Sequence, residues 1–393
     1  MKKKMNAGLL IVVSALLAAL CGCAGPFKTL TPAMIRNDLE GVRQRYFVPS
    51  LGVAEITADE IVVYGPVGKA KIGYDTPVTQ DSFYQLGSCT KAMTATALSR
   101  LLQERSLPWD TRLLELFPEF AATAHRDYRD VTLADIVSHQ AGFPAEGDLE
   151  TVNRLRNYSG SLTQYLGELL QRPARIRRGR FFYSNGGYAV LGAVIERVSG
   201  TPYTEAMNRL LFEPLGLKPH FGFPSDLGPD QPWGHTAYWG AAAPGRAMDQ
   251  FLPAPLWPAG MVNMTVKEYA RFAQLHLRGL LGKDDAGFSS DMIRRLHKPR
   301  IDMESPMGTA YAAGWVRETV NGHKLHWHNG STGNFYTYMV IDPDREKAVV
   351  VVTNVGDSQG DRVCWDIVYR LLFGGGTSAA PSDRFPASAA IAR

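Results

Sequence analysis

Segments with strand character open and close this 393-residue chain, and the long stretch between them has mainly helical patterns. Short runs rich in β-branched or aromatic residues lie near the two ends, at 51–57, 60–67, 69–74, 325–328, 335–341 and 348–353. Strands this far apart in the sequence can share one core only by pairing across the chain. The pattern therefore predicts an α+β fold, with one antiparallel sheet flanked by helices and built from both ends around a large helical insertion.

Apolar periodicity predicts the helices. They are expected at 33–45, from Ser88 onward, after the capping residue Thr132, and at 162–170, 187–198, 203–212, 266–280 and 362–373. The stretch 219–258, rich in proline, glycine and aromatic residues, is expected to be an extended loop region. We therefore expect one domain over 31–373, with a sheet part at about 31–92 and 299–373 and a helical part at about 93–298.

The first 23 residues are typical of an export signal. Three lysines precede an apolar run over 7–20, which is shorter than the roughly 20 residues of a membrane span. The following Leu20-Cys21-Gly22-Cys23-Ala24 resembles a bacterial lipoprotein cleavage box, with Cys23 as the lipidated residue. This predicts an exported protein of the bacterial cell envelope or periplasm, attached to a membrane through that lipid; a plain signal peptide or an uncleaved anchor are the alternatives. Residues 374–393, rich in Gly, Ala, Ser and Pro, are expected to be a disordered tail.

Composition narrows the classes of partner. The chain is 45% hydrophobic and 20% charged, as in ordinary globular proteins. Its formal charge of +4 comes largely from Lys2, Lys3 and Lys4, so the remainder is nearly neutral and gives no reason to expect nucleic-acid binding. Outside the signal, Cys89 and Cys364 are expected to pack as small hydrophobic residues, although an exported protein could join them in a disulfide.

Ser88 and Lys91 form the first part of a candidate catalytic site. Residues three apart lie on one face of a helix, so Lys91 can reach the Ser88 hydroxyl. A serine at a helix start also lies beside free backbone N–H groups and the positive end of the helix dipole. A lysine that loses its proton by desolvation could then act as the base for a nucleophilic serine.

Two later segments can complete the site. Tyr183 could ionise more easily beside a lysine ammonium and move protons between Ser88 and a leaving group, and Asn185 could hold Lys91 and contact substrate. His328-Asn329-Gly330 ends a predicted strand, where Gly330 would let a substrate backbone approach the strand edge. The backbone N–H groups of Ser88 and Ser331 would then form an oxyanion hole.

These three elements, in this order, resemble those of serine β-lactamases and penicillin-binding proteins, and most closely the class C β-lactamase and DD-peptidase/esterase branch. The resemblance covers about 31–373 and includes the segments 136–142, 212–217 and 258–262. It implies that Ser88 is the nucleophile, that Lys91 and Tyr183 share the role of base, and that Asn185 supports Lys91 and substrate. It implies equally that His328, Gly330 and Ser331 line the third wall of the site, with no cofactor and no metal.

One departure from the resemblance bears on substrate. Class C β-lactamases carry Lys-Thr-Gly where this chain has His328-Asn329-Gly330, and histidine is mostly neutral at pH 7. A neutral histidine binds a substrate carboxylate less strongly. We therefore expect a β-lactamase-related serine hydrolase of DD-peptidase or esterase type, acting as a monomer on a small molecule or a peptidoglycan peptide. A class C-type β-lactamase proper, and a penicillin-recognising binding or sensor protein with little turnover, are the alternatives.

Three other patterns carry rival interpretations. Gly356-Asp357-Ser358-Gln359-Gly360 fits the nucleophile elbow of α/β-hydrolases, but no histidine follows position 328. His323, His326 and His328 could ligate zinc, but they alternate with other residues as on an ordinary strand. Five arginines before Tyr183 could recognise a substrate carboxylate or simply form a solvated basic loop; they are Arg172, Arg175, Arg177, Arg178 and Arg180.

Overall fold

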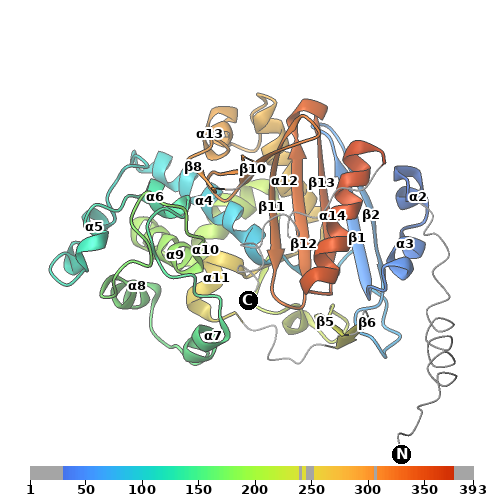
Figure 1. The fold of residues 1–393 in the computed structure, drawn as a ribbon, viewed down its shortest axis with the longest axis horizontal. Helices are drawn as coiled ribbons and strands as arrows, with labels where there is room; N and C mark the ends of the chain where they lie inside the picture. The colour runs from blue at the N-terminus through green and yellow to red at the C-terminus, as the bar shows by residue number, and fades with distance from the viewer. Residues whose placement is uncertain (1–29, 239–240, 245–251, 305–307, 376–393) are drawn as a thin grey trace, which may run out of the picture.

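An eight-stranded antiparallel sheet forms the centre of the computed structural model, which describes residues 30–238, 241–244, 252–304 and 308–375 (Figure 1). The strand order is β2-β1-β13-β12-β11-β10-β9-β8. The strands are β1 (Ser50–Ile56), β2 (Ile61–Gly68), β8 (Ile301–Asp302), β9 (Ala310–Tyr311), β10 (Val316–Val320), β11 (His323–Ser331), β12 (Tyr336–Asp342) and β13 (Lys347–Thr353). The first strand pairs with the last along its length, from Leu51 opposite Thr353 to Ile56 opposite Ala348. The predicted α+β fold with one sheet built from both chain ends is therefore correct.

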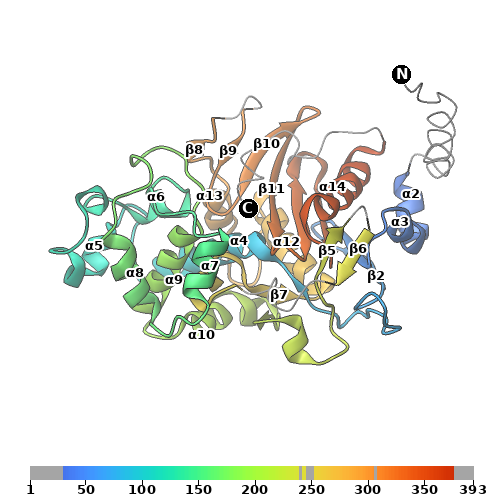
Figure 2. The ribbon, with the colours of Figure 1, turned by 60° about the horizontal axis from the view of Figure 1, so that its bottom comes forward.

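Each face of the sheet is covered by its own layer of helices, as the two ribbon views show (Figures 1 and 2). On one face, Val349 and Val351 of β13 pack with α2 (Pro32–Asn37), α3 (Leu39–Arg45) and α14 (Asp357–Phe373). On the other face, Val350 and Val352 pack with α4 (Thr90–Glu104) and α12 (Val266–Leu280). Successive side chains of a strand point to opposite faces, so the buried valine run of β13 serves both cores.

The helical part extends from α4 to one side of the sheet. It includes α5 (Leu113–Leu116), α6 (Leu133–Val137), α7 (Leu149–Leu155), α8 (Leu162–Leu170), α9 (Asn185–Ser199), α10 (Tyr203–Met207), α11 (Trp257–Gly260) and α13 (Ser290–Leu296). The predicted segments 162–170 and 266–280 coincide with α8 and α12, and Thr132 caps α6 with a reciprocal bond from Asp135. Among the described residues, no helix has both the length and the apolar character needed to cross a membrane.

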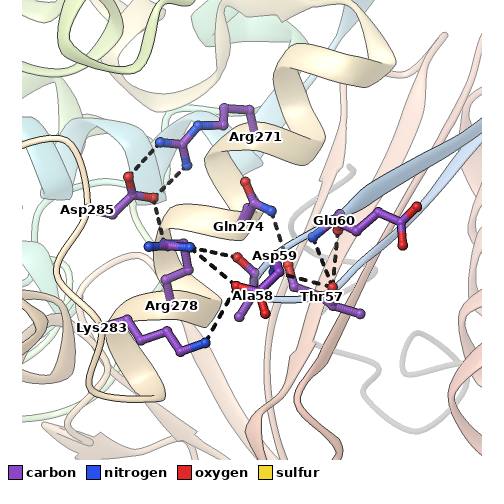
Figure 3. Close-up of polar contacts among 9 residues, drawn as sticks. All are labelled: Thr57, Ala58, Asp59, Glu60, Arg271, Gln274, Arg278, Lys283 and Asp285. Carbon is purple, nitrogen blue, oxygen red and sulfur yellow. Dashed lines mark hydrogen bonds and ion pairs between the residues drawn. The ribbon is translucent and has the colours of Figure 1, made fainter.

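A cluster of charged side chains holds α12 to the turn between β1 and β2 (Figure 3). Arg278 donates to the carbonyl oxygen of Ala58 at 2.8 Å and pairs with Asp285 at 3.3 Å. Arg271 makes two bonds to the same Asp285 carboxylate, at 2.7 and 2.8 Å. Gln274 adds a bond to the carbonyl oxygen of Thr57. These bonds fix α12 on the face of the sheet where Val350 and Val352 lie.

Several predicted elements differ from the structure. Residues 69–74 form no strand: only Lys69 makes a bridge, to Pro77, and the chain turns at Gly73, whose φ is +84°. The helix expected at 33–45 is two helices, because Asp38 leaves helical geometry to cap α3 through Gly41 N–H. The loop region expected at 219–258 contains β4 (His220–Phe221), β5 (His235–Tyr238) and β6 (Ala241–Pro244).

Other expectations concern the chain ends and the cysteines. The signal segment 1–23 with Cys23, and nearly all of the tail 374–393, lie outside the described residues, so their assignment stays a prediction. Cys89 and Cys364 are both buried and both free. Burial raises the pKa of the Cys89 thiol to about 11, so this side chain stays neutral and packs as a small hydrophobic residue.

Candidate active site

Ser88 lies in a 3-10 turn, Gly87–Cys89, that leads directly into α4. The helix itself begins at Thr90, two residues later than the pattern suggested. Ser88 is 8% exposed, whereas Lys91 in the first turn of α4 is completely buried. The serine hydroxyl therefore lies at the N-terminal end of a 15-residue helix, where unpaired N–H groups and the helix dipole favour developing negative charge.

The Lys91 amine makes three short contacts, to Ser88 Oγ at 3.0 Å, Asn185 Oδ1 at 2.8 Å and the Ala259 carbonyl oxygen at 2.8 Å. Burial away from water lowers the pKa of Lys91 well below its usual range. A neutral amine has two N–H groups and one lone pair. The two carbonyl oxygens can only accept, so they take both N–H groups, and the lone pair is left for the Ser88 hydroxyl. This geometry makes Lys91 a proton acceptor for the serine.

Tyr183 lies beside this pair, with the Lys91 amine 4.8 Å from the centre of its ring. Its hydroxyl is buried and makes no hydrogen bond of ordinary geometry to a described residue. The expectation that the phenol ionises more easily is wrong: burial raises the pKa of Tyr183, and the nearby Ser88 hydroxyl offsets only part of that rise. Tyr183 is a neutral phenol at rest, able to donate a proton but not to act as a standing base.

Asn185 is the first residue of α9, which is capped by the side chain of Ser184. Its Nδ2 group donates to the carbonyl oxygen of Glu146 at 3.5 Å, and this orients Oδ1 toward Lys91. The predicted support of Lys91 by Asn185 is thus present in the geometry. Sequence reasoning missed the second support, the Ala259 carbonyl oxygen, because a backbone acceptor has no residue signature.

Strand β11 reaches the serine because two glycines let backbones approach. A Cβ atom on Gly330 would lie 1.9 Å from the Leu86 carbonyl oxygen, and one on Gly87 would lie 2.7 Å from Ser331 N. The space at Gly330 was expected to admit substrate; the chain's own backbone fills it. β10 pairs with β11 only up to Trp327, so the last residues of β11 have an unpaired edge toward Ser88. Both backbone nitrogens of the expected oxyanion hole are close to this contact: a Cβ atom on Gly330 would also lie 3.0 Å from Ser88 N.

His328 faces the site as a buried, neutral imidazole. Its Nδ1 is 2.5 Å from the carbonyl oxygen of Asn329, and its Nε2 is 3.1 Å from the hydroxyl of Tyr311. Burial away from water lowers the pKa of His328 to about 3. A carbonyl oxygen only accepts, so Nδ1 carries the proton and Nε2 accepts from Tyr311. Tyr311 was not singled out from the sequence, because nothing distinguishes one tyrosine of a two-residue strand.

His139 supports the same wall from behind. It has a positive φ of +62° and its Nδ1 accepts from Ser184 N–H at 3.1 Å, so it serves as a structural turn residue. Its ring lies 4.3 Å from that of Tyr183, between centroids. Burial lowers the pKa of His139 well below its usual range, so no cation is added here.

The rival sites do not assemble. His323 pairs with Asp342, His326 bonds to His297, and His328 bonds to Tyr311, so these three histidines share no metal position. Ser358 of the elbow-like sequence is exposed in the first turn of α14. Three of the five arginines are ion-paired: Arg172 with Glu146, Arg178 with Asp135 and Arg180 with Glu304.

Comparison with known proteins extends this description. A family model described as Beta-lactamase matches residues 35–372. "Penicillin-binding protein 4" of Amycolatopsis lactamdurans is 26% identical over 331 residues, covering 82% of this chain and 84% of that protein. "Unguisins hydrolase ungD'" of Aspergillus campestris is 26% identical over 368 residues, covering 87% of this chain but only 64% of that protein. The chain thus spans less than two thirds of the latter relative.

Solved structures share the fold. The octameric penicillin-binding protein homologue from Pyrococcus abyssi superposes with a TM-score of 0.70 at 22% identity, covering 90% of this chain and 79% of that one. The structure of SurE superposes with a TM-score of 0.72 at 23% identity, covering 88% and 77%. At this level of identity the likeness concerns the fold alone.

Proposed function

Because the chain belongs to the Beta-lactamase family, we propose that it is a serine hydrolase that forms an acyl-enzyme on Ser88. Its substrates are amide, β-lactam or ester carbonyls, and a DD-peptidase-like or esterase-like activity suits the site best. The observation that carries the proposal is the Lys91 amine, buried and 3.0 Å from Ser88 Oγ with both its other contacts to acceptors. The names of two relatives, a penicillin-binding protein and a hydrolase, agree with this proposal.

In the proposed acylation, Ser88 Oγ attacks the substrate carbonyl carbon while its proton passes to Lys91. The tetrahedral oxyanion lies between the N–H groups of Ser88 and Ser331. As the bond to the leaving group breaks, the proton on Lys91 reaches that group through the Tyr183 hydroxyl, which gives one proton and receives another. Water then attacks the acyl-enzyme in the reverse sense, and Ser88 regains its proton.

Intact-mass analysis tests this proposal. The protein is exposed to a penicillin, a D-Ala-D-Ala peptide and a short-chain ester, and the same panel is run on Ser88→Ala. We expect a mass increase equal to one acyl group in the native protein and none in the variant. The matched control is Ser358→Ala, which should behave as the native protein. A persistent adduct in Ser88→Ala would refute Ser88 as the nucleophile.

The same panel separates the alternatives. Turnover of the penicillin at least as fast as of the ester would support a class C-type β-lactamase. One acyl group per protein with no turnover of any substrate would support a penicillin-recognising sensor. Steady turnover of ester or peptide, with slow release of penicillin, supports the proposed activity.

We also propose that the protein works in the bacterial cell envelope, exported through residues 1–23 and anchored by a lipid on Cys23. The neutral composition beyond the signal and the substrate range agree with this setting. Mass analysis of membrane-extracted protein should show a chain that begins at a diacylated Cys23; a soluble chain that begins at another residue would refute the anchor. The expectation of a monomer is tested by light scattering of the same sample.

A further inference from the structure

The third wall of the site carries no positive charge. His328 is 2% exposed and lies between Tyr311, Tyr183 and the backbone of its own strand. Both of its ring nitrogens are committed, Nδ1 to the Asn329 carbonyl oxygen and Nε2 to the Tyr311 hydroxyl. The imidazole therefore has neither a charge nor a spare N–H to offer to a substrate carboxylate.

Tyr311 is the group that holds His328 in this state. It is fully buried in β9, where it pairs with Val316 of β10 and Ile301 of β8. Burial raises its pKa well above the usual range for tyrosine, so the hydroxyl keeps its proton and can donate it to Nε2. A donor at Nε2 competes directly with a second proton at that nitrogen.

The other cations described near this wall are also engaged. Arg180 forms a 2.8 Å pair with Glu304, and the Arg300 guanidinium lies over the Trp109 ring at 5.1 Å. The Lys91 amine is directed at Ser88 and two carbonyl oxygens. A carboxylate close to the scissile bond would thus lose its water shell without gaining an ionic partner from these residues.

We propose that Tyr311 is a positioning residue that keeps His328 neutral, and that the site consequently selects acyl donors whose scissile carbonyl has no carboxylate beside it, namely neutral esters and amides. This inference rests on the proposed acyl-enzyme at Ser88 and narrows its substrate class. It predicts poor use of peptides with a free C-terminal carboxylate next to the cleaved bond, and of β-lactams, whose ring carboxylate has the same position.

A matched substrate pair tests selectivity. The pair consists of a depsipeptide whose leaving group ends in a free carboxylate and the same compound with a carboxamide. We expect kcat/KM of the native protein to be about tenfold or more higher for the carboxamide, because the acid loses its water shell without gaining the charge-assisted bond that would offset this loss. His328→Lys should bring the ratio toward one or invert it. Equal or better use of the acid by the native protein would overturn the inference while leaving the acyl-enzyme at Ser88 intact.

The role of Tyr311 needs its own readout. In Tyr311→Phe, Nε2 loses its donor, so we expect the ratio of kcat/KM for the acid to kcat/KM for the carboxamide to rise as the pH falls from 8 to 5, with no such trend in the native protein. The ratio cancels the pH dependence that both substrates share through Lys91. The matched control is Tyr84→Phe, which removes a buried hydroxyl that donates to Ser50 at 3.0 Å rather than to His328. The control should keep the native ratio at every pH. The same flat profile in Tyr311→Phe would overturn the positioning role.

Nitrogen-15 spectra of histidine-labelled protein provide a check that does not depend on substrate or on stability of the variant. The His328 signal, assigned by its loss in His328→Gln, should show a proton on Nδ1 only and no titration between pH 8 and 5. A His328 that takes a second proton within that range would overturn the inference. Absence of any Ser88 adduct with both substrates would instead refute the proposed function, and the inference with it.

Discussion

A single buried amine determines the chemistry of this site. The hydrogen-bond partners of the Lys91 amine among the described residues are a hydroxyl and two carbonyl oxygens rather than a carboxylate, and burial favours its uncharged form. A base that is already neutral can take the serine proton at the start of the reaction. Burial of this amine lowers the free energy of unfolding, because removing an ammonium from water is unfavourable.

Acylation should therefore depend on pH through Lys91. The amine must be neutral, and its pKa is lowered, so the rate should rise with pH to a plateau that begins well below pH 10.5. Lys91→Arg should lose about 10³-fold or more in acylation rate at every pH, because a guanidinium keeps its proton. Rapid-quench mass analysis with the ester measures the pH profile of the native protein and the acylation rate of Lys91→Arg. A plateau reached only near pH 10, or an active Lys91→Arg, would contradict the assigned role.

The residues of the candidate site could be identified from the sequence more reliably than the structural role of each one. Ser88, Lys91, Tyr183 and Asn185 were named from their sequence pattern, and the structure brings them together. Gly330 was also named, but for space that substrate would use, whereas the Leu86 backbone occupies it. The difference arises because a glycine signals a close approach without specifying what approaches.

At the scale of elements, three buried histidines connect α4, the helix of Lys91, to β11, the strand of His328. His276 of α12, His297 at the end of α13 and His326 of β11 are linked by bonds of 2.9 Å. The hydroxyl of Thr96 on α4 donates to the Ala92 carbonyl oxygen, so it accepts from His276 Nε2 at 3.2 Å. The direction of every bond in the row then follows: His276 and His297 each donate once and accept once, His326 donates from Nδ1, and all three are neutral.

This histidine row should make the fold sensitive to mild acid. Burial lowers the pKa of His276 and of His326 to about 3, and the Arg317 charge on β10 adds to the effect at His326. Below the usual pKa of about 6.5 the unfolded chain takes up protons that the folded chain refuses. The free energy of unfolding should then fall by up to about 1.4 kcal/mol per pH unit for each histidine between pH 6.5 and 3.

Urea unfolding between pH 6.5 and 5, where ordinary carboxylates are already ionised, measures this slope. His326→Gln should show a smaller decrease of stability over that range than the native protein, although it is less stable at pH 7. If the free energy of unfolding falls with pH equally steeply in the variant and in the native protein, His326 takes up its proton equally well in the folded and unfolded chain, and its pKa is not lowered by folding.

Helices with strong apolar periodicity were predictable from the sequence, whereas the short strands β8, β9 and β10 were not. α8 and α12 have clear apolar faces and matched their predicted bounds, but β8 and β9 contain two residues each, too few for any pattern. β10 was missed because Arg317, Glu318 and Thr319 hide its alternation. Tyr311 lies in one of these short strands, so the residue that controls His328 was invisible to pattern analysis.

In the molecule as a whole, the sheet lies between two apolar cores and draws strands from both chain ends. Ser88 in the turn before α4 and Lys91 in α4 lie on one face, whereas His328 to Ser331 belong to a strand in the middle of the sheet. The valines of β13 face both cores in turn. Both apolar cores include side chains of the sheet, so unfolding of one core should also unfold the other.

We therefore expect unfolding in one cooperative step, and Ile367→Ala tests it at a site on the opposite face from Ser88. Ile367 is fully buried in α14, so the variant should lose about 2–5 kcal/mol of stability. Circular dichroism and acylation of Ser88 should both be lost at the same lowered urea concentration. The control Leu227→Ala, at a residue 46% exposed, should shift neither midpoint. Acylation that survives the loss of sheet structure in Ile367→Ala would show that the helical part holds the site independently, contrary to a sheet shared by both ends of the chain.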